Sequence, residues 1–213
     1  MWQKRAVDAV VALGALVILA PVLAVIAALI RVIDGRPIFF AQQRSGLQGE
    51  PFQLLKFRTM STESEDPTTD ATRITKLGAR LRATSLDELP TLWTVARGDM
   101  SLVGPRPLPV RYLERYSPVQ RRRLEVRPGV TGLAQVKGRN LLSWEDRFDL
   151  DVHYVDHRSS RGDLEILVET FRSVLRREGV EVAGTVTMPE FWGSDHGQSP
   201  TDQPPTDQPP TMP

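Results

Sequence analysis

The sequence predicts an α+β protein in which an N-terminal membrane helix is followed by a mostly helical domain with a small β-hairpin. Three observations carry this prediction. Residues 9–30 form a run of 22 residues without a charge. Residues 37–43 and 52–57 are short apolar runs separated by glycines, which is typical of a hairpin. Several later segments have apolar residues at helical spacing.

The uncharged run is long enough to cross a bilayer. As a helix rising about 1.5 Å per residue it would extend roughly 33 Å, close to the ~30 Å of a hydrocarbon core. A cleaved signal peptide is disfavoured, because the run exceeds a typical apolar signal segment and no small-x-small cleavage pattern follows it. Pro21, near its middle, is expected to break or kink the helix.

Basic residues flank both ends of this run, with Lys4 and Arg5 before it and Arg31 and Arg36 after it. The positive-inside rule therefore suits both ends on the cytoplasmic face. The residues alone leave two topologies open, a spanning helix or a helix that breaks and returns through one leaflet. Asp8 lies four residues after Lys4, so the two can pair near the membrane interface.

Apolar spacing and helix-stopping residues predict the elements that follow the membrane segment. Residues 74–82 and 86–97 are expected to be helices, the second ending at Gly98, and residues 144–154 and 164–177 two more. Residues 110–127 form a basic amphipathic stretch with two open interpretations, an interfacial helix on the membrane or the solvated face of a packed helix.

The amino-acid composition and the charge distribution exclude several kinds of functional site. The chain has no cysteine, which excludes disulfides, thiolate metal sites and a cysteine nucleophile. The net charge is 0 over residues 1–70, +9 over residues 71–139 and −8 over residues 140–213, so the middle third is expected to bind anionic groups. Nucleic acid is disfavoured because no interleaved aromatics or known motif accompany the arginines. Residues 194–213, which contain TDQPP twice, are expected to form a disordered tail.

An acidic pair, Asp87 and Glu88, lies at a predicted helix start. Its structural interpretation is a helix cap, because Ser85 and Glu88 have capping-box spacing. Its functional interpretation rests on Arg82 and on Arg106, which lies in a rigid Gly-Pro-Arg-Pro loop and could clamp a phosphate. A carboxylate at a helix N-terminus stays ionised and can attack phosphorus, and paired carboxylates beside phosphate suit Mg²⁺.

The chain resembles the bacterial sugar transferase family, the small monotopic phosphoglycosyl transferases. The matching stretches are KFRTM at residues 56–60, residues 84–90 and 98–107 with GDMSLVGPRP, RPGVTGLAQVKGRN at residues 127–140, and residues 151–155. The early Lys4-Arg5-x-x-Asp8 and the TMPEFWG segment at residues 187–193 also fit, so the resemblance covers roughly residues 2–193.

The resemblance implies a reaction. Asp87 would attack the sugar-bearing phosphorus of a UDP-sugar, releasing UMP and forming an aspartyl phosphosugar that passes to polyprenyl (undecaprenyl) phosphate. Glu88 would hold Mg²⁺ together with Asp87, or position the phosphate. Phosphate contacts are expected from five basic residues: Arg82, Arg106, Arg139, Lys56 and Arg58. For Lys56 and Arg58 an exposed strand face is the competing interpretation, and for Arg139 it is a turn beside Gly138.

The resemblance also implies location and partners. Residues 1–36 would form a re-entrant helix, broken near Pro21 and anchored by Lys4, Arg5 and Asp8, with both ends on the cytoplasmic side of the inner membrane. Residues 37–193 would form the catalytic domain. The donor sugar is expected to be an N-acetylated amino sugar. A non-catalytic membrane-anchored scaffold is the alternative function, and assembly into a homo-oligomer stays open.

Overall fold

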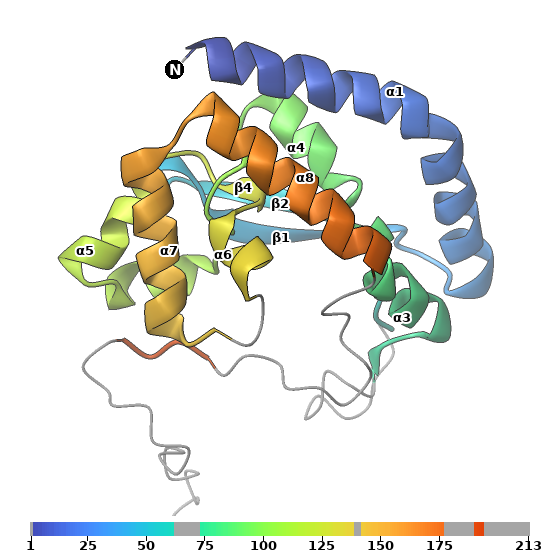
Figure 1. Cartoon of the computed structure of the whole chain (residues 1–213). Coiled ribbons are helices and arrows are strands. Elements are labelled where there is room, and N and C mark those ends of the chain that lie inside the picture. Colours follow the sequence, from blue (N-terminus) through green and yellow to red (C-terminus); the bar gives the residue numbers. More distant parts are fainter. Residues whose placement is uncertain (1, 62–72, 139–141, 177–189, 194–213) are drawn as a thin grey trace, which may run out of the picture.

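The computed structural model describes residues 2–61, 73–138, 142–176 and 190–193 (Figure 1). Arg139, the first three residues of the TMPEFWG segment (187–189) and the Pro-rich tail therefore lie outside the described residues. The described part contains one long N-terminal helix, two two-stranded sheets and a set of shorter helices, which agrees with the predicted α+β class.

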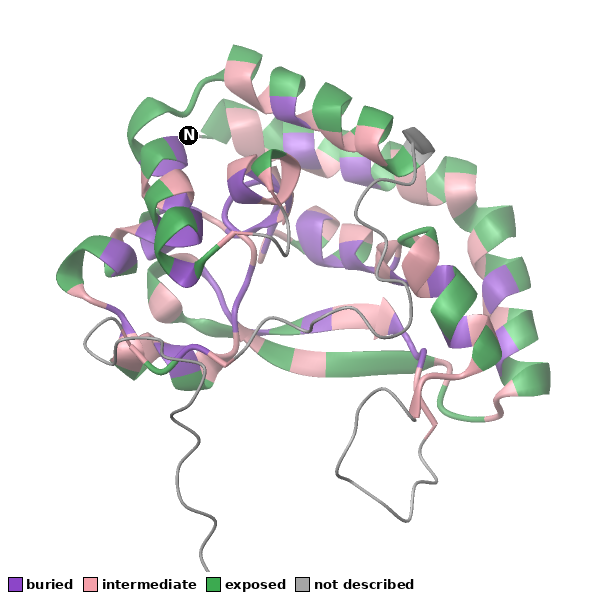
Figure 2. Ribbon diagram, turned by 60° about the horizontal axis from the view of Figure 1, so that its bottom comes forward, coloured by how far each residue is buried: buried purple, intermediate pink, exposed green. Residues whose placement is uncertain are grey.

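Helix α1, Trp2–Ile33, is the long apolar helix, and by length and composition it could cross a membrane. It stays helical through Pro21 but changes direction, so that two arms lie along different sides of the domain (Figure 1). The predicted break is therefore a bend, because a proline removes one helical hydrogen bond without ending the helix. Most of α1 faces outward, and Val17 and Ile18 are about three-quarters exposed (Figure 2).

Both arms of α1 bind the rest of the domain. Near the start, Lys4 Nζ lies 2.6 Å from Asp163 Oδ2, and Arg5 donates to the backbone oxygens of Val95 and Ala96. Buried Asp8 accepts a 2.7 Å hydrogen bond from Ser101 Oγ.

At the other end of α1, the Asp34 carboxylate accepts a 3.0 Å hydrogen bond from Thr75 Oγ1. The Arg58 guanidinium donates to the backbone oxygen of Asp34. One domain thus holds both ends of the apolar helix.

The predicted β-hairpin is confirmed. Strands β1 (Phe39–Ser45) and β2 (Pro51–Phe57) pair antiparallel with Phe39 opposite Phe57, and the short η1 turn (Leu47–Gly49) joins them. The two phenylalanine rings stack with centroids 5.3 Å apart. Side chains alternate between the two faces of β2. Leu54 and Lys56 line one pocket, whereas Leu55 and Phe57 line another on the opposite face.

The helix predicted over residues 86–97 divides into two elements. A single 3-10 turn, η2 (Leu86–Glu88), follows α3 (Lys76–Ala83), and α4 covers Thr91–Arg97 before Gly98 ends it at φ +107°. Pro90 lacks the N–H that a continuous helix would need there. The predicted capping box is wrong, because Ser85 adopts φ +55° and its side chain makes no cap.

Two short strands that the sequence did not predict as a pair lie side by side. Strand β3 (Ser101–Val103) pairs parallel with β4 (Gly129–Thr131), and the short helix α6 (Leu133–Lys137) follows. Three-residue strands are too short to give a periodic signal. This pair fixes the start of the loop that holds Arg106.

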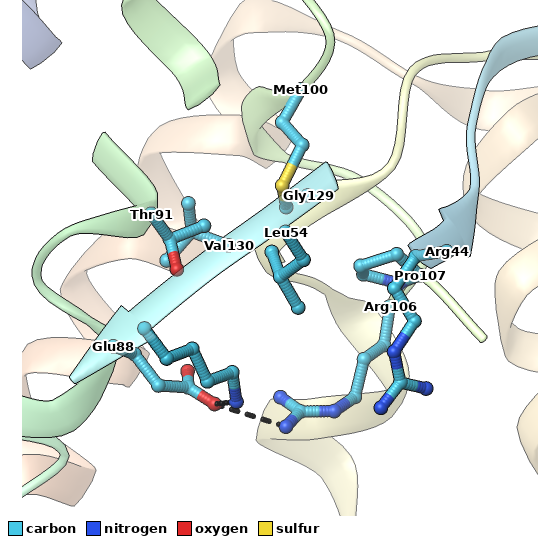
Figure 3. Close-up of a pocket in the computed structure, with 10 residues that line it drawn as sticks. Arg44, Leu54, Glu88, Thr91, Met100, Arg106, Pro107, Gly129 and Val130 are labelled. Atoms are coloured by element: carbon cyan, nitrogen blue, oxygen red, sulfur yellow. Dashed lines mark hydrogen bonds and ion pairs between the residues drawn. The ribbon is translucent and has the colours of Figure 1, made fainter. Parts of the chain in front are cut away.

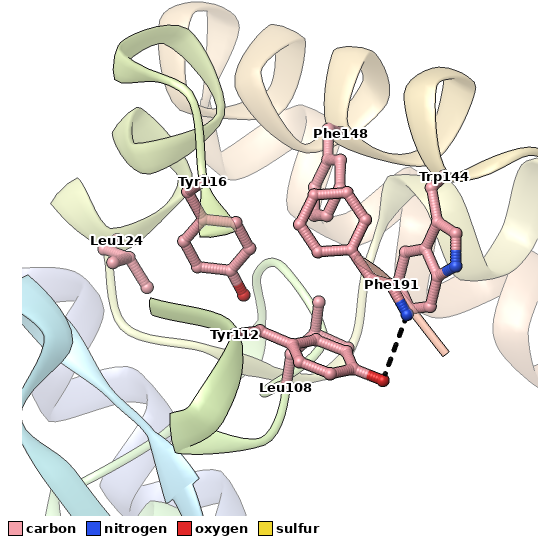
Figure 4. Packing of buried hydrophobic residues seen from close by; sticks show 7 residues of the cluster. All are labelled: Leu108, Tyr112, Tyr116, Leu124, Trp144, Phe148 and Phe191. Atoms are coloured by element: carbon pink, nitrogen blue, oxygen red, sulfur yellow. Dashed lines mark hydrogen bonds between the residues drawn. The ribbon is translucent and has the colours of Figure 1, made fainter. Parts of the chain in front are cut away.

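The basic stretch 110–127 is not one amphipathic helix, and that prediction is corrected. It forms η3 (Val110–Arg115), α5 (Pro118–Arg121) and η4 (Arg122–Glu125). Its apolar side chains Tyr112, Tyr116, Leu124 and Val126 are buried in the domain while Val119 is exposed, so this stretch fits the packed alternative better than a membrane surface. The cluster that receives them contains Leu108, Tyr112, Tyr116, Leu124, Trp144, Phe148 and Phe191 (Figure 4).

The last two predicted helices are confirmed as α7 (Trp144–His157) and α8 (Ser160–Arg176). Helix α8 packs Ile166 against the domain but exposes Leu164 and Phe171 by 61% and 65%. Among the described helices after α1, α8 is thus the one with an outward apolar face of the kind predicted for an interfacial helix.

Candidate active site

The acidic pair lies on the η2 turn between α3 and α4. Glu88 Oε1 accepts from Lys56 Nζ of β2 at 2.6 Å and from Arg106 Nη2 at 3.0 Å (Figure 3). The three residues line a pocket whose apolar wall includes Leu54 and Met100. The structure therefore brings together three of the predicted site residues, from segments far apart in the sequence.

The charges in this pocket shape the titration of Glu88. Burial alone would raise the pKa of its carboxyl group, but Arg106 and Lys56 outweigh this and lower the pKa to about 2. Glu88 is therefore ionised at neutral pH. Burial lowers the pKa of Lys56, opposed by the Glu88 carboxylate beside it.

Asp87 is buried beside this pocket, with 8% of its surface exposed. Burial and the adjacent Glu88 carboxylate raise its pKa, while Lys56 and Arg82 act in the opposite direction. The expectation that a helix N-terminus keeps Asp87 ionised is corrected, because Asp87 lies in a single 3-10 turn rather than at the start of α4. Lys56 and Arg82 oppose the rise in the pKa of Asp87 but do not outweigh burial and Glu88.

The loop that holds Arg106 is fixed by backbone hydrogen bonds. Gly104 N donates to Thr131 O and Gly129 N donates to Pro105 O, both at 2.9 Å. A Cβ at Gly104 would lie 2.4 Å from Arg127 O, so no larger residue fits the close approach. The sequence signal Gly-Pro-Arg-Pro thus corresponds to a loop whose backbone is fixed where Arg106 begins.

The other predicted phosphate-binding residues lie in different surroundings. Arg82 Nε donates to Thr59 Oγ1 at 2.9 Å, and the guanidinium is close enough to Asp87 to affect its titration. Arg58 is 95% buried and donates to Asp34 O at the end of α1, so it does not line the pocket. Arg139 lies outside the described residues.

One lining residue was missed by the sequence reasoning. Arg44 of β1 lies in the same pocket as Arg106. Burial lowers its pKa to about 10, with a further contribution from the positive charge of Arg106. The only signal was a lone arginine at the end of a predicted strand, which looks the same as an ordinary exposed charge.

The residues present fit Mg²⁺ bound with substrate but not a site built from protein ligands alone. Within the described ranges no group of three or more His, Asp or Glu side chains could hold a metal ion. Two adjacent carboxylates are enough when phosphate oxygens and water complete the shell, as Mg²⁺ prefers. His153 and His157 stack with their ring centroids 4.2 Å apart on the exposed side of α7, and within the described residues they belong to no group of three or more possible metal ligands.

Comparison with known proteins identifies the family. The model of the bacterial sugar transferases matches residues 1–177. The chain belongs to this family. It is 47% identical to the uncharacterized sugar transferase EpsL of Bacillus subtilis over 197 residues, 91% of this chain and 98% of that protein.

Two further relatives carry more specific names. This sugar transferase is 38% identical over 197 residues to the exopolysaccharide production protein ExoY of Sinorhizobium fredii, covering 83% of this chain and 87% of that one. It is 40% identical over 186 residues to the UDP-glucose:undecaprenyl-phosphate glucose-1-phosphate transferase of Caulobacter vibrioides, covering 81% and 70%.

Proposed function

We propose that this sugar transferase moves a sugar-1-phosphate from a UDP-sugar to undecaprenyl phosphate and so begins the assembly of a lipid-linked glycan. The observation that carries the proposal is the single pocket in which Glu88, Lys56 and Arg106 meet beside buried Asp87. The names of two relatives, one for exopolysaccharide production and one for glucose-1-phosphate transfer to this lipid, agree with it.

The reaction has two steps in this proposal. A carboxylate oxygen of Asp87 attacks the sugar-bearing phosphorus, the bond to the UMP oxygen breaks, and UMP leaves with that electron pair. A phosphate oxygen of the lipid then attacks the same phosphorus and releases Asp87. Phosphoryl transfer depends mainly on positioning and on neutralising charge, which Lys56 and Arg106 are placed to do.

Asp87 and Glu88 would hold Mg²⁺ when substrate is bound, and the ion would add positive charge next to the phosphate oxygens. Glu88 has a second task in this proposal. Because its Oε1 accepts from both Lys56 and Arg106, it holds these two cations close together in the lining of the pocket.

The contacts of α1 support a re-entrant topology. Lys4 and Arg5 near its start and Asp34 just past its end bind the same domain. A straight spanning helix would separate these ends by about 30 Å across the bilayer, whereas a bent helix can keep both on one side. We place that side at the cytoplasmic face of the inner membrane, where UDP-sugars are available.

The donor sugar is the least constrained part of the proposal. The prediction of an N-acetylated amino sugar stays a prediction, and the name of the Caulobacter relative makes UDP-glucose the first competitor to test. A non-catalytic scaffold is the alternative function. It gives no reason for the buried Asp87 carboxylate to lie near the two cations Lys56 and Arg82, which argues against it.

The test is UMP release by the full chain in nanodiscs with Mg²⁺, undecaprenyl phosphate and a panel of UDP-sugars. Release is expected to require the sugar nucleotide and to be absent in Asp87→Asn, with that variant as stably folded as the native chain. Unchanged release in Asp87→Asn would exclude the covalent mechanism. The preferred donor decides between the amino sugar and glucose.

A further inference from the structure

Arg44 contributes a further guanidinium to the pocket of the acidic pair. Its side chain extends from the end of β1 toward the same side as the side chain of Arg106 (Figure 3). Glu88 Oε1 already accepts from Lys56 and Arg106. The pocket thus contains three cations against one lining carboxylate, an excess of positive charge that favours an anion with more than one negative charge.

The Arg44 side chain is held in one orientation. Its Nη2 donates to Gln42 Oε1 at 2.6 Å. Its Nε is buried and has no hydrogen-bond partner among the described residues. A buried N–H without an acceptor costs free energy, which an oxyanion would remove by accepting from it.

Arg44 and Arg106 are fixed relative to each other through the backbone. Ser45, the next residue after Arg44, donates from both N and Oγ to Leu108 O at 3.0 Å, and Arg44 forms a β-bridge with Pro109. Leu108 lies two residues beyond Arg106, so the strand and the Gly-Pro-Arg-Pro loop form one rigid unit. Two like charges are thereby held close together, and a shared anion would relieve their repulsion.

We propose that Arg44 binds the diphosphate of the nucleotide donor together with Arg106, and contacts the phosphate that leaves with the nucleoside. This inference rests on the proposed function. It adds to the site a residue that neither the sequence nor the family comparison singled out.

The two faces of β2 favour the nucleotide over the lipid phosphate as the ligand of Arg44. Leu54 and Lys56 line the Arg44 pocket. Leu55 and Phe57, on the opposite face, line a separate apolar cavity whose other walls include residues of α1. The acceptor lipid approaches from the membrane helix, whereas the water-soluble donor can reach the face on which Arg44 lies.

The experiment measures UDP binding to the full chain in nanodiscs, because UDP carries the diphosphate but has no sugar to transfer. Arg44→Gln is compared with Arg111→Gln, which removes a positive charge that is close to Arg44 but outside the pocket lining. We expect UDP binding to weaken about 10-fold or more in Arg44→Gln, less than about 3-fold in Arg111→Gln, and to recover partly in Arg44→Lys. Binding of undecaprenyl phosphate should be unchanged in Arg44→Gln.

A second readout separates binding from a structural role. Without UDP, Arg44→Gln should unfold at the same temperature as the native chain or a higher one, because it removes a like charge and an unsatisfied N–H. The inference is overturned by equal weakening in Arg44→Gln and Arg111→Gln, by unchanged UDP binding, by a native chain that does not bind UDP, or by a lower unfolding temperature. Weakened binding of the lipid instead of UDP would also overturn it. UMP release is measured separately, so loss of the proposed function is distinguishable from loss of this inference.

Discussion

Arg123 and Asp151 form a buried ion pair, with Arg123 Nη2 2.7 Å from Asp151 Oδ2 and both side chains at most 3% exposed. The same Nη2 atom also donates to the backbone oxygen of Arg106 at 2.7 Å. The pair therefore joins helix α7 to the loop that holds a cation of the active site. Through Arg123, Asp151 thus supports the loop that holds Arg106.

Replacing Asp151 should destabilise the protein strongly. Asp151→Asn keeps the shape of the side chain but leaves the Arg123 charge buried without a counter-charge, which typically costs about 3–5 kcal/mol. We expect the unfolding temperature to fall by roughly 10 °C, measured by thermal unfolding of the full chain in nanodiscs. Asp156→Asn is the matched control on the same helix, because its ion pair with Arg122 is exposed. Equal effects of the two substitutions would contradict the assignment.

Replacing Arg106 by lysine tests the geometry of the pocket rather than its charge. Lysine keeps the positive charge but cannot present a planar fork to phosphate and Glu88 together. We expect kcat/KM for UMP release to fall about 10- to 100-fold in Arg106→Lys. Arg97→Lys, whose exposed side chain pairs with Asp99, should keep the native value. Native activity in Arg106→Lys would show that only charge is needed at this position.

The topology of α1 can be tested with single cysteines, because the native chain has none. Gln3→Cys and Arg36→Cys lie near the two ends of the helix and are exposed. A membrane-impermeant thiol reagent should label both sites in inside-out vesicles and neither in intact spheroplasts. Labelling of Gln3→Cys from the periplasmic side would restore a simple spanning helix.

The ion pairs that Glu190 forms with Arg111 and Arg115 should weaken at low pH. Hydrogen bonds from Arg115 and Arg111 lower the pKa of Glu190 below that of an unfolded glutamate, about 4.3. A lowered folded-state pKa stabilises the native state fully above the unfolded value, and this stabilisation is lost as the pH falls through the folded value. The difference in unfolding temperature between the native chain and Glu190→Gln should therefore be present at pH 7 and shrink below about pH 4. A difference in unfolding temperature that stays constant with pH would contradict a stabilising role for the ion pairs of Glu190.

The sequence predicted the parts of the fold that have strong local signals. The hairpin, α7, α8 and the helix stop at Gly98 follow from alternation, helical spacing and one glycine. The stretch 110–127 was predicted wrongly, because its spacing fits a helix while buried aromatic packing around Tyr112 and Tyr116 divides it into short turns. The pairing of β3 with β4 could not be predicted, since the two strands are distant in the sequence and meet only in the folded chain.

For the candidate site, too, some residues could be predicted from the sequence and others could not. Glu88 and Arg106 were predicted from their motifs and do meet. Arg58, in the same motif as Lys56, instead binds Asp34 at the end of α1, and nothing in the local sequence separates these two roles. Arg44 was missed because its place in the pocket depends on the contact between β1 and Leu108, 63 residues later.

In the proposed mechanism Asp87 carries the sugar phosphate between the two steps, and intact mass spectrometry detects such an adduct. The native chain is incubated with Mg²⁺ and its UDP-sugar donor without the lipid acceptor, with Asp87→Asn in parallel. We expect a mass increase equal to one sugar phosphate on the native chain, located on Asp87, that disappears when undecaprenyl phosphate is added. The same adduct on Asp87→Asn, or UMP release by the native chain without any adduct, would contradict it.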